Sequence, residues 1–410
     1  MRVALVGAVG VGIAAVAWCG CNSLRTSDPP KVEPQRVASV AGAEQTLALR
    51  LLVRLGAQAP GTNTLIGPDS LLSAMTLAAS GANAETRAQL LGAIGFDPSH
   101  DAPLEAMAAL QHTLAQASAS DGVQLAVVHR LWIDEGQRLT EAWRQRVDAV
   151  FEHAFETLDF RNAPEDAREE INEFVADATD DKIVDLLPPG SVDGTTRLVV
   201  TNATWFKGLW EFPFDAELTL PGAFTKRDGT RVDVPMMKMN ASVGFAEKDD
   251  EVVVELPYQG GELAMLVIVP KDIAGLAEWP ADAFTRKAAS LNTQEVDVVL
   301  PRFTFRGKYA LVDTFRDLGV TDAFDQGRAD FSAMEERREL FIAGIHHQAF
   351  IDVDEQGTEA AAATGVTWAL KSAPARIPVF RADRPFVFAI RHRATGAILF
   401  AGVVEDPSKT

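Results

Sequence analysis

Residues 352–372 read D-V-D-E-Q-G-T-E-A-A-A-A-T-G-V-T-W-A-L-K-S, and between Glu359 and Lys371 this segment carries no charged side chain. On local propensity alone, the four alanines from 360 to 363 favour a short exposed helix. The period of two supports a different interpretation, because an extended chain sorts its residues onto two faces. One face carries Thr358, Ala360, Ala362, Thr364, Val366, Trp368 and Leu370, and the other carries Glu359, Ala361, Ala363, Gly365, Thr367 and Ala369.

This composition suits a loop that can enter a β-sheet as an additional strand. A loop that stays in water normally carries more charge, whereas small uncharged residues fit between two strands. Gly357 stands where such a strand would begin, and glycine permits a bend there without steric cost. The segment is therefore interpreted as a strand that is not yet in its sheet.

The rest of the chain predicts an α+β domain. Helical spacing of apolar residues predicts helices over 43–58, 69–80, 84–94, 102–117, 139–149 and 164–178. Runs of β-branched and aromatic residues predict strands over 123–133, 197–206, 252–256, 263–269, 296–305, 340–353, 386–390 and 398–404. Helices come first and strands later, without the alternation of a wound parallel sheet, which favours α+β. No linker or repeat interrupts residues 42–410, so we expect one domain.

The N-terminus predicts export. Residues 1–20 read as a signal peptide, with an apolar run too short to cross a bilayer comfortably. Cys21 follows Gly20 and is interpreted as the lipidated residue of a lipoprotein-type signal, although Trp18 stands where leucine is usual; plain secretion is the alternative. Residues 21–41 are predicted to be a flexible linker. Since Cys19 and Cys21 are the only cysteines, the domain has no disulfide.

Bulk charge and missing motifs exclude several functions. The net charge of −19 would repel a phosphate backbone, so we expect no nucleic-acid partner. The chain has no H-E-x-x-H, no G-x-S-x-G and no glycine-rich phosphate loop, and its seven histidines have no ligand-spaced partners. We therefore expect no enzyme activity, no metal and no cofactor.

Five segments together resemble the serpin family, over essentially all of residues 43–410. In chain order they are D-L-L-P-P-G-S (185–191), T-N-A-T-W-F-K-G-L-W (201–210), L-G-V-T-D-A-F (318–324), E-Q-G-T-E-A-A-A-A-T (355–364) and F-R-A-D-R-P-F-V-F-A-I (380–390). The resemblance is to a bacterial, inhibitory member, because the fourth segment matches the hinge of inhibitors. It implies a serpin fold: α+β, with a large central mostly antiparallel β-sheet, additional smaller sheets, about eight or nine helices and an exposed reactive-centre loop.

The resemblance also implies a mechanism. A serine protease would attack the loop and form an acyl-enzyme, and the cleaved loop would insert into the central sheet and distort the trapped protease. Insertion of residues 357–370 would span roughly 45 Å at the rise of a strand.

The reactive bond follows from a count. In the family it follows the seventeenth residue from the hinge glutamate, and counting from Glu355 places it between Lys371 and Ser372. Lysine there favours a trypsin-like protease as the covalent partner, because such proteases have an acidic primary pocket. Leu370 would be the bait if the register slips by one, which would favour a chymotrypsin-like protease, and Arg376 is a less favoured site.

Three groups of residues take roles from the resemblance. The hinge comprises Glu355, Gly357, Thr358, Glu359, Ala360, Ala361, Ala362, Ala363 and Thr364. The shutter, which governs opening of the sheet, comprises Ser70, Asn202 and His347; the breach, where the loop first enters, comprises Trp210, Arg302 and Glu355. Gly67 stands where the family usually has a serine, which removes one hydroxyl from the shutter. A core histidine and a surface ion pair are the alternative interpretations of His347 and of Glu355 with Arg302.

The expected protein is thus an exported, monomeric serine protease inhibitor, either a cell-envelope lipoprotein or secreted into the extracellular space. It would contact a membrane only through a lipid on Cys21. The alternative is a non-inhibitory binding or structural protein on the same fold.

Overall fold

The computed structural model describes residues 31–119, 122–151, 153–248, 250–358 and 377–409. The α-helices in these ranges are α1 (Pro34–Gln58), α2 (Pro68–Gly81), α3 (Ala84–Ala93), α4 (Leu104–Ala117), α5 (Glu141–Asp148), α6 (Pro164–Ala178), α7 (Ala283–Ala289) and α8 (Val312–Asp317). Two short 3-10 helices are η1 (Ile273–Glu278) and η2 (Asp322–Phe324). None of the described helices is long and apolar enough to cross a bilayer.

The strands fall into two sheets. The first has six strands in the order β10 (Phe303–Ala310), β11 (Ile342–Val353), β12 (Gly357–Thr358), β4 (Leu198–Leu209), β2 (Val123–Asp134) and β3 (Phe155–Leu158). The second has nine: β1 (Thr64–Ile66), β15 (Ile398–Val404), β14 (Phe386–His392), β8 (Leu263–Pro270), β7 (Glu251–Pro257), β6 (Arg231–Lys248), β9 (Asn292–Pro301) and β13 (Val379–Arg381), with β5 (Asp215–Thr225) paired to β6.

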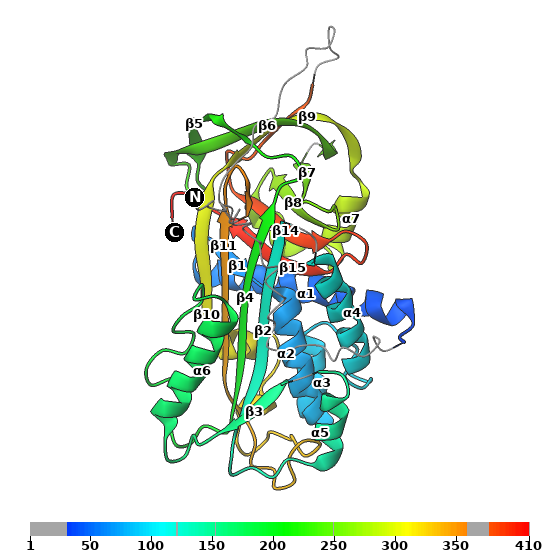
Figure 1. The fold of residues 1–410 in the computed structure, drawn as a ribbon, viewed down its shortest axis with the longest axis vertical. Helices are drawn as coiled ribbons and strands as arrows, with labels where there is room; N and C mark the ends of the chain where they lie inside the picture. The colour runs from blue at the N-terminus through cyan, green and yellow to red at the C-terminus, as the bar shows by residue number, and fades with distance from the viewer. Residues whose placement is uncertain (1–30, 120–121, 152, 249, 359–376, 410) are drawn as a thin grey trace, which may run out of the picture.

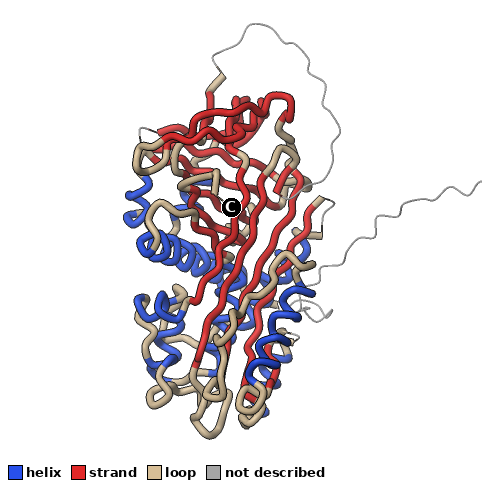
Figure 2. The backbone as a smooth tube through the Cα atoms, turned by 90° about the vertical axis from the view of Figure 1, so that its left-hand side faces the viewer, coloured by secondary structure: helices blue, strands red, loops and turns tan. Residues whose placement is uncertain are grey.

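The six-stranded sheet is central. Its long strands run along the long axis of the molecule, with α6 on one side and α2 to α5 on the other (Figure 1). Alternation along β2 explains this, because Val128 and Trp132 pack with α6 while Val127 and Leu131 join the main core beneath α2. The tube in Figure 2 shows the second sheet across one end of the first.

The expected fold is confirmed, including mostly antiparallel pairing in the central sheet. The exceptions there are β11 with β4 and β2 with β3, which are parallel. The second sheet is continuous because β6, which has 18 residues, pairs with β5 and β9 along one part and with β7 along another.

Three sequence predictions need correction. The linker predicted over 21–41 ends too late, because α1 begins at Pro34 and already buries Val40 and Ala41 against the core. Pro34 lies in the first turn of α1, where proline is favoured, so it marks the start of the helix and not the end of the linker. The strand predicted over 296–305 is two strands that belong to different sheets, β9 and β10, separated at Arg302. Both β5 and β6 were missed: β5 is mostly exposed and has no continuous buried face, whereas the apolar and polar residues of β6 alternate from Met237 to Phe245 and this signal was overlooked.

Candidate functional site

A two-residue strand lies between two parallel neighbours in the central sheet. Along most of their length β11 and β4 pair directly with each other, from Ile342 opposite Leu198 to Phe350 opposite Trp205. We call this parallel pairing the seam. At one end of the seam β12 separates the two strands and pairs antiparallel with both of them. The start of the reactive segment is therefore already a strand within the sheet.

Gly357 is required by a close approach of backbone. A Cβ atom on Gly357 would lie 2.0 Å from the carbonyl oxygen of Gly208 on β4, which no real side chain tolerates. The sequence prediction assigned this glycine to a bend. Its described role is different: it lets β12 lie against β4 without a clash.

The next residue, Thr358, is fully buried and is held by a tyrosine. The hydroxyl groups of Thr358 and Tyr258 lie 2.8 Å apart. Tyr258 stacks on Trp210 with 4.6 Å between ring centroids, and its burial raises the pKa of its hydroxyl. Sequence reasoning missed Tyr258, although tyrosine is rare here: the chain has two, and the other, Tyr309, stacks on His347.

The three predicted breach residues come together beside β12. The carboxylate of Glu355 accepts a hydrogen bond from Arg302 Nη2 at 2.6 Å, and also one from the Thr219 hydroxyl at 2.7 Å. Trp210 Nε1 donates to the carbonyl oxygen of Asp354 at 3.0 Å. Burial favours the neutral acid of Glu355, but the bonds from Thr219 and Arg302 outweigh burial and hold the pKa of Glu355 below its usual value. Glu355 is thus a buried, ionised anchor.

The predicted shutter residues also come together, across the middle of the seam. Asn202 on β4 donates from Nδ2 to the Ser70 hydroxyl on α2 and contacts His347 Nδ1 on β11 through Oδ1. The backbone N–H of Gly67 donates to His347 Nε2 at 3.1 Å, so Nδ1 carries the ring hydrogen. Burial lowers the pKa of His347 to about 3, which keeps it neutral. The cluster therefore bonds both strands of the seam to the start of α2.

Thr204 explains why Gly67 departs from the usual serine. A Cβ on Gly67 would lie 2.2 Å from the Thr204 methyl group and 3.6 Å from His347 Cε1. The methyl group of a buried threonine on β4 thus fills the space that a side chain at position 67 would need. The absence of a side chain at position 67 and the Thr204 methyl group thus fit each other in the packing.

Several predicted residues lie outside the described ranges. These are Glu359 to Thr364 of the hinge, Lys371 and Ser372 of the reactive bond, the signal peptide over 1–20, and Cys21.

Two other places in the structure gather polar side chains. A polar cavity of about 350 Å³ is lined in part by Arg130, Arg144 and Glu156, and Arg130 forms an ion pair with Glu156 there. Across the described ranges no group of three or more His, Cys, Asp or Glu is placed to hold a metal ion.

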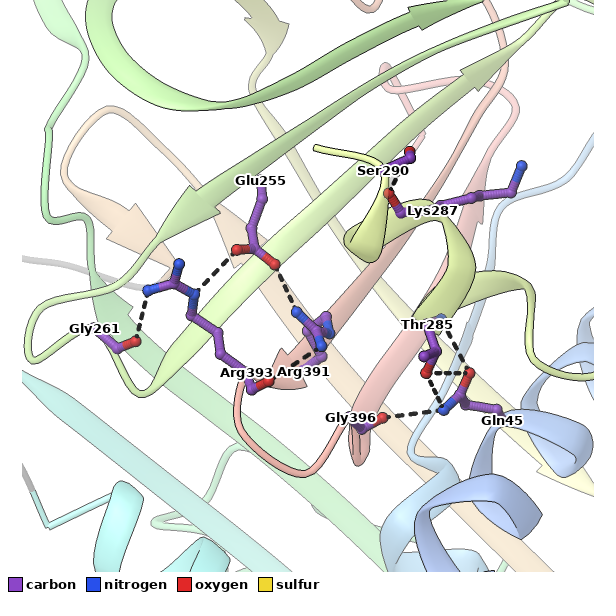
Figure 3. A network of polar contacts seen from close by, with 9 residues as sticks. All are labelled: Gln45, Glu255, Gly261, Thr285, Lys287, Ser290, Arg391, Arg393 and Gly396. Carbon is purple, nitrogen blue, oxygen red and sulfur yellow. Dashed lines mark hydrogen bonds and ion pairs between the residues drawn. The ribbon is translucent and has the colours of Figure 1, made fainter. Parts of the chain in front are cut away.

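The second place is the polar network in Figure 3, where Glu255 receives hydrogen bonds from Arg391 at 2.7 Å and from Arg393 at 3.0 Å. In the same view Gln45 joins α1 to Thr285 of α7 and to Gly396. These bonds tie neighbouring elements together and are interpreted as structural.

Comparisons with known proteins agree with this geometry. The family described as "Serpin (serine protease inhibitor)" matches residues 42–407. An uncharacterized serpin-like protein of Methanosarcina mazei is 35% identical over 378 residues, which cover 90% of this chain and 87% of that protein. Leukocyte elastase inhibitor A of Mus musculus is 34% identical, covering 90% of this chain and 99% of that protein. The solved structure of a tumour suppressing serpin has the same fold, with a TM-score of 0.81 at 22% identity, covering 90% of this chain and all of that one.

Proposed function

Because this chain belongs to the serpin family, we propose that it is a suicide-substrate inhibitor that traps a trypsin-like serine protease as an acyl-enzyme. Relatives that carry the name of protease inhibitors support the inhibitory class. The trapping mechanism and the trypsin-like target rest on the residues of this chain, in particular on β12 and Lys371.

The single observation that carries the proposal is the position of β12 at the end of the seam. Parallel pairing is slightly less stable per residue than antiparallel pairing. Extending β12 would replace the parallel contact of β11 with β4 by two antiparallel contacts, as it already does at Thr358 with Val353 and Gly208. The inserted state therefore gains hydrogen bonds without a new fold.

The length of the seam matches the length of the hinge and loop. Continued in the register of β12, Thr364 would lie opposite His347 and Asn202, and so would separate the two shutter residues that now contact each other. Trp368 would lie opposite Leu198, the first residue of β4. The strand would then be complete a few residues before the proposed reactive bond.

The chain between Thr358 and Val379, which we call the tether, explains why insertion would need cleavage. Thr358 lies in the central sheet, whereas Val379 lies in β13 of the other sheet, so the chain between them joins two sheets. Full insertion would draw the residues up to 371 into the central sheet, and the residues after 371 would then have to move away from the position that joins them to β13. Cleavage between Lys371 and Ser372 removes this restraint and lets the freed arm carry the bound protease along the seam.

The experiment is incubation of the purified protein with trypsin, followed by denaturing electrophoresis. We expect a covalent complex that survives boiling in detergent; cleaved product without complex would contradict trapping of a trypsin-like protease. Mass spectrometry of the released C-terminal peptide identifies the bond. A peptide that begins at Ser372 supports Lys371 as bait. In a parallel incubation with chymotrypsin, a covalent complex together with a peptide that begins at Lys371 would support Leu370 and a chymotrypsin-like target.

The alternative, a non-inhibitory protein on this fold, differs in one measurement. Loop insertion after cleavage should raise the melting temperature of the cut protein. If the cut protein and the uncut protein have the same melting temperature, a binding or structural role would be favoured.

We also propose that the protein is exported and monomeric, with Cys21 lipidated. The support is the pattern of residues 1–20 before Gly20 and Cys21. Incorporation of labelled palmitate that is lost in Cys21→Ala tests the lipid; a secreted, unlabelled protein would favour plain secretion.

A further inference from the structure

Two carboxyl side chains are buried against each other where α1 meets α2. Glu44 of α1 is 0% exposed and Asp69 of α2 is 1% exposed. Each carboxyl group is a hydrogen-bond partner of the other in setting their pKa values, so the two groups lie side by side. Two carboxylates have only acceptor atoms, so this bond requires that one of the two groups carries a proton. The mechanism proposed above makes no use of either residue.

The surroundings assign the proton to Glu44. Asp69 lies in the first turn of α2, where the helix dipole favours a negative charge, and its Oδ1 accepts from Gln111 Nε2 at 2.7 Å. Glu44 Oε2 accepts from the backbone N–H of Ile398 at 2.9 Å, and no donor reaches its Oε1. Glu44 Oε1 thus holds the proton and donates it to the Asp69 carboxylate.

Burial, followed by the charge of Asp69, raises the pKa of Glu44 well above its ordinary value of 4.5. Burial likewise raises the pKa of Asp69, against the hydrogen bonds from Gln111 and Glu44, which lower it. Like charges in contact inside a protein disfavour ionisation of both groups.

Among the residues that the structure describes, no basic group is paired with Glu44 or Asp69. In the described chain neither carboxyl group has an ion pair, and β1 and β15, which pack on α1, carry no titratable side chain. On β2, His129 faces the same core, and burial lowers its pKa to about 3, so it is neutral.

The other titratable groups on these elements and their packing partners are exposed, partly exposed or paired elsewhere. They are Arg36, Arg50 and Arg54 of α1, Glu85 and Arg87 of α3, Glu105 and His112 of α4, Arg130 and Asp134 of β2, Lys207 of β4, Glu141, Arg144, Arg146 and Asp148 of α5, Glu278 of η1, and Asp313, Arg316 and Asp317 of α8. Loss of the shared proton would therefore leave two adjacent buried anions.

The pair adjoins the shutter. Asp69 stands between Gly67, which donates to His347, and Ser70, which accepts from Asn202. These two bonds join the first turn of α2 to both strands of the seam. Repulsion between two anions would move this turn away from α1 and weaken the bonds.

We propose that the proton shared by Glu44 and Asp69 keeps the seam between β11 and β4 closed, and that its release as the pH rises opens the sheet. The effect on the sheet rests on the proposed function, since it assumes that the seam accepts a strand. A raised pKa in the closed state means that this contribution to stability is complete below pH 4.5 and is lost as the pH rises through the raised value.

The proton is tested first, by infrared spectroscopy of the uncleaved protein near neutral pH. We expect a C=O band of a buried protonated carboxylic acid that is lost in Glu44→Gln. Glu105→Gln is the matched control, because Glu105 is a partly exposed glutamate on α4, which also packs on α1. A spectrum of Glu44→Gln identical to the wild type in this region would overturn the shared proton.

The opening of the sheet is tested with a synthetic peptide that copies residues 357–370, whose insertion into the seam is followed by native electrophoresis from about pH 6 to about pH 9. In the wild type and in Glu105→Gln, the extent of insertion should rise by up to about tenfold per pH unit while the open form releases the proton and the closed form retains it. In Glu44→Gln the extent of insertion should change by no more than about twofold over the same pH range.

Each further outcome decides the question. Equal pH dependence in the wild type and in Glu44→Gln overturns the proposal, and so does an absence of insertion at every pH, which also contradicts loop insertion itself. If the infrared band is missing but insertion of the peptide rises with pH as expected, only the shared proton is overturned. If Glu44→Gln does not fold, Asp69→Asn removes the same charge pair: insertion should lose its pH dependence in the same way, whereas the infrared band of the Glu44 acid should remain.

Discussion

The hydroxyl groups of Tyr258 and Thr358 lie 2.8 Å apart in a fully buried contact, so the reactive segment enters the central sheet through a hydrogen bond to a single tyrosine. Tyr258→Phe removes one partner and leaves the threonine hydroxyl buried without a bond. We expect a loss of about 1 kcal/mol in the free energy of unfolding of the uncleaved protein. In a Thr358→Val background the same change should have almost no effect, and an equal loss in both backgrounds would show that the hydroxyl contact is not its cause.

Thr364→Arg should turn the inhibitor into a substrate. In the register of β12, insertion would place position 364 opposite Asn202 and His347, which are both 0% exposed, and would bury an unpaired guanidinium there at a cost of several kcal/mol by rough estimate. Stoichiometry against trypsin measures this as a shift from covalent complex to cleaved product. Gln356→Arg is the control, because Gln356 is only partly buried and precedes the strand. Retained inhibition by Thr364→Arg would count against insertion.

Glu355→Gln should loosen the breach only moderately. The partner Arg302 is 47% exposed, so solvent screens the ion pair and we expect about 1 kcal/mol of destabilisation. Since the pKa of Glu355 is lowered, this contribution is present above pH 4.5 and is lost as the pH falls through the lowered value. Urea unfolding of the wild type and of Glu355→Gln at neutral and at acid pH measures the loss of stability and its pH dependence. A difference in the free energy of unfolding that grows on acidification would refute an ionised Glu355.

Gly67→Ser should destabilise the protein despite restoring the family's usual residue. Its Cβ would lie 2.2 Å from the Thr204 methyl group, and overpacking of this kind costs about 1–3 kcal/mol. Thr204→Ser removes that methyl group, so the double variant should recover most of the stability. Thermal melting of both single variants and of the double variant checks this, and a double variant no more stable than Gly67→Ser would disprove the packing explanation.

Acid should unfold the protein through its buried histidines. Burial lowers the pKa of His129 and His347 to about 3 and that of His346 to about 4, from an ordinary 6.5. The unfolded chain therefore binds protons first, and stability falls below pH 6.5 by up to about 1.4 kcal/mol per pH unit for each histidine. His346→Gln should reduce this slope, while replacement of the exposed His100 should not. Equal slopes in all three proteins would exclude His346 as a contributor.

The sequence was sufficient for elements with simple local patterns. The prediction for β15 and that for α6 coincide with the structure at both ends, because a continuous apolar run and an N-terminal proline are local signals. It also contained a signal for β6 that was missed, since buried Met237 and Met239 alternate with the less buried Lys238 and Asn240. It was insufficient for β5, which is mostly exposed and is a strand through its pairing with β6.

For the site, motifs identified the residues but not their partners. Asn202 and His347 were singled out, and the contact between them depends on the parallel pairing of strands about 145 residues apart in the chain. Glu44 was hidden inside a helical pattern of leucines, and only the packing of α1 on α2 places it beside Asp69. Tertiary contacts of this kind have no local signature.

The tether between the two sheets also has a consequence for how the chain reaches its native state during synthesis. The residues able to fill the seam leave the ribosome before β13, β14 and β15, which anchor the far end of the tether through β9, β8 and β1. Productive folding therefore requires that the C-terminal hairpin of β14 and β15 packs in place before the reactive loop fills the seam. A nascent chain stalled near residue 376 would have no anchor, and it should fold directly to the form that can inhibit nothing.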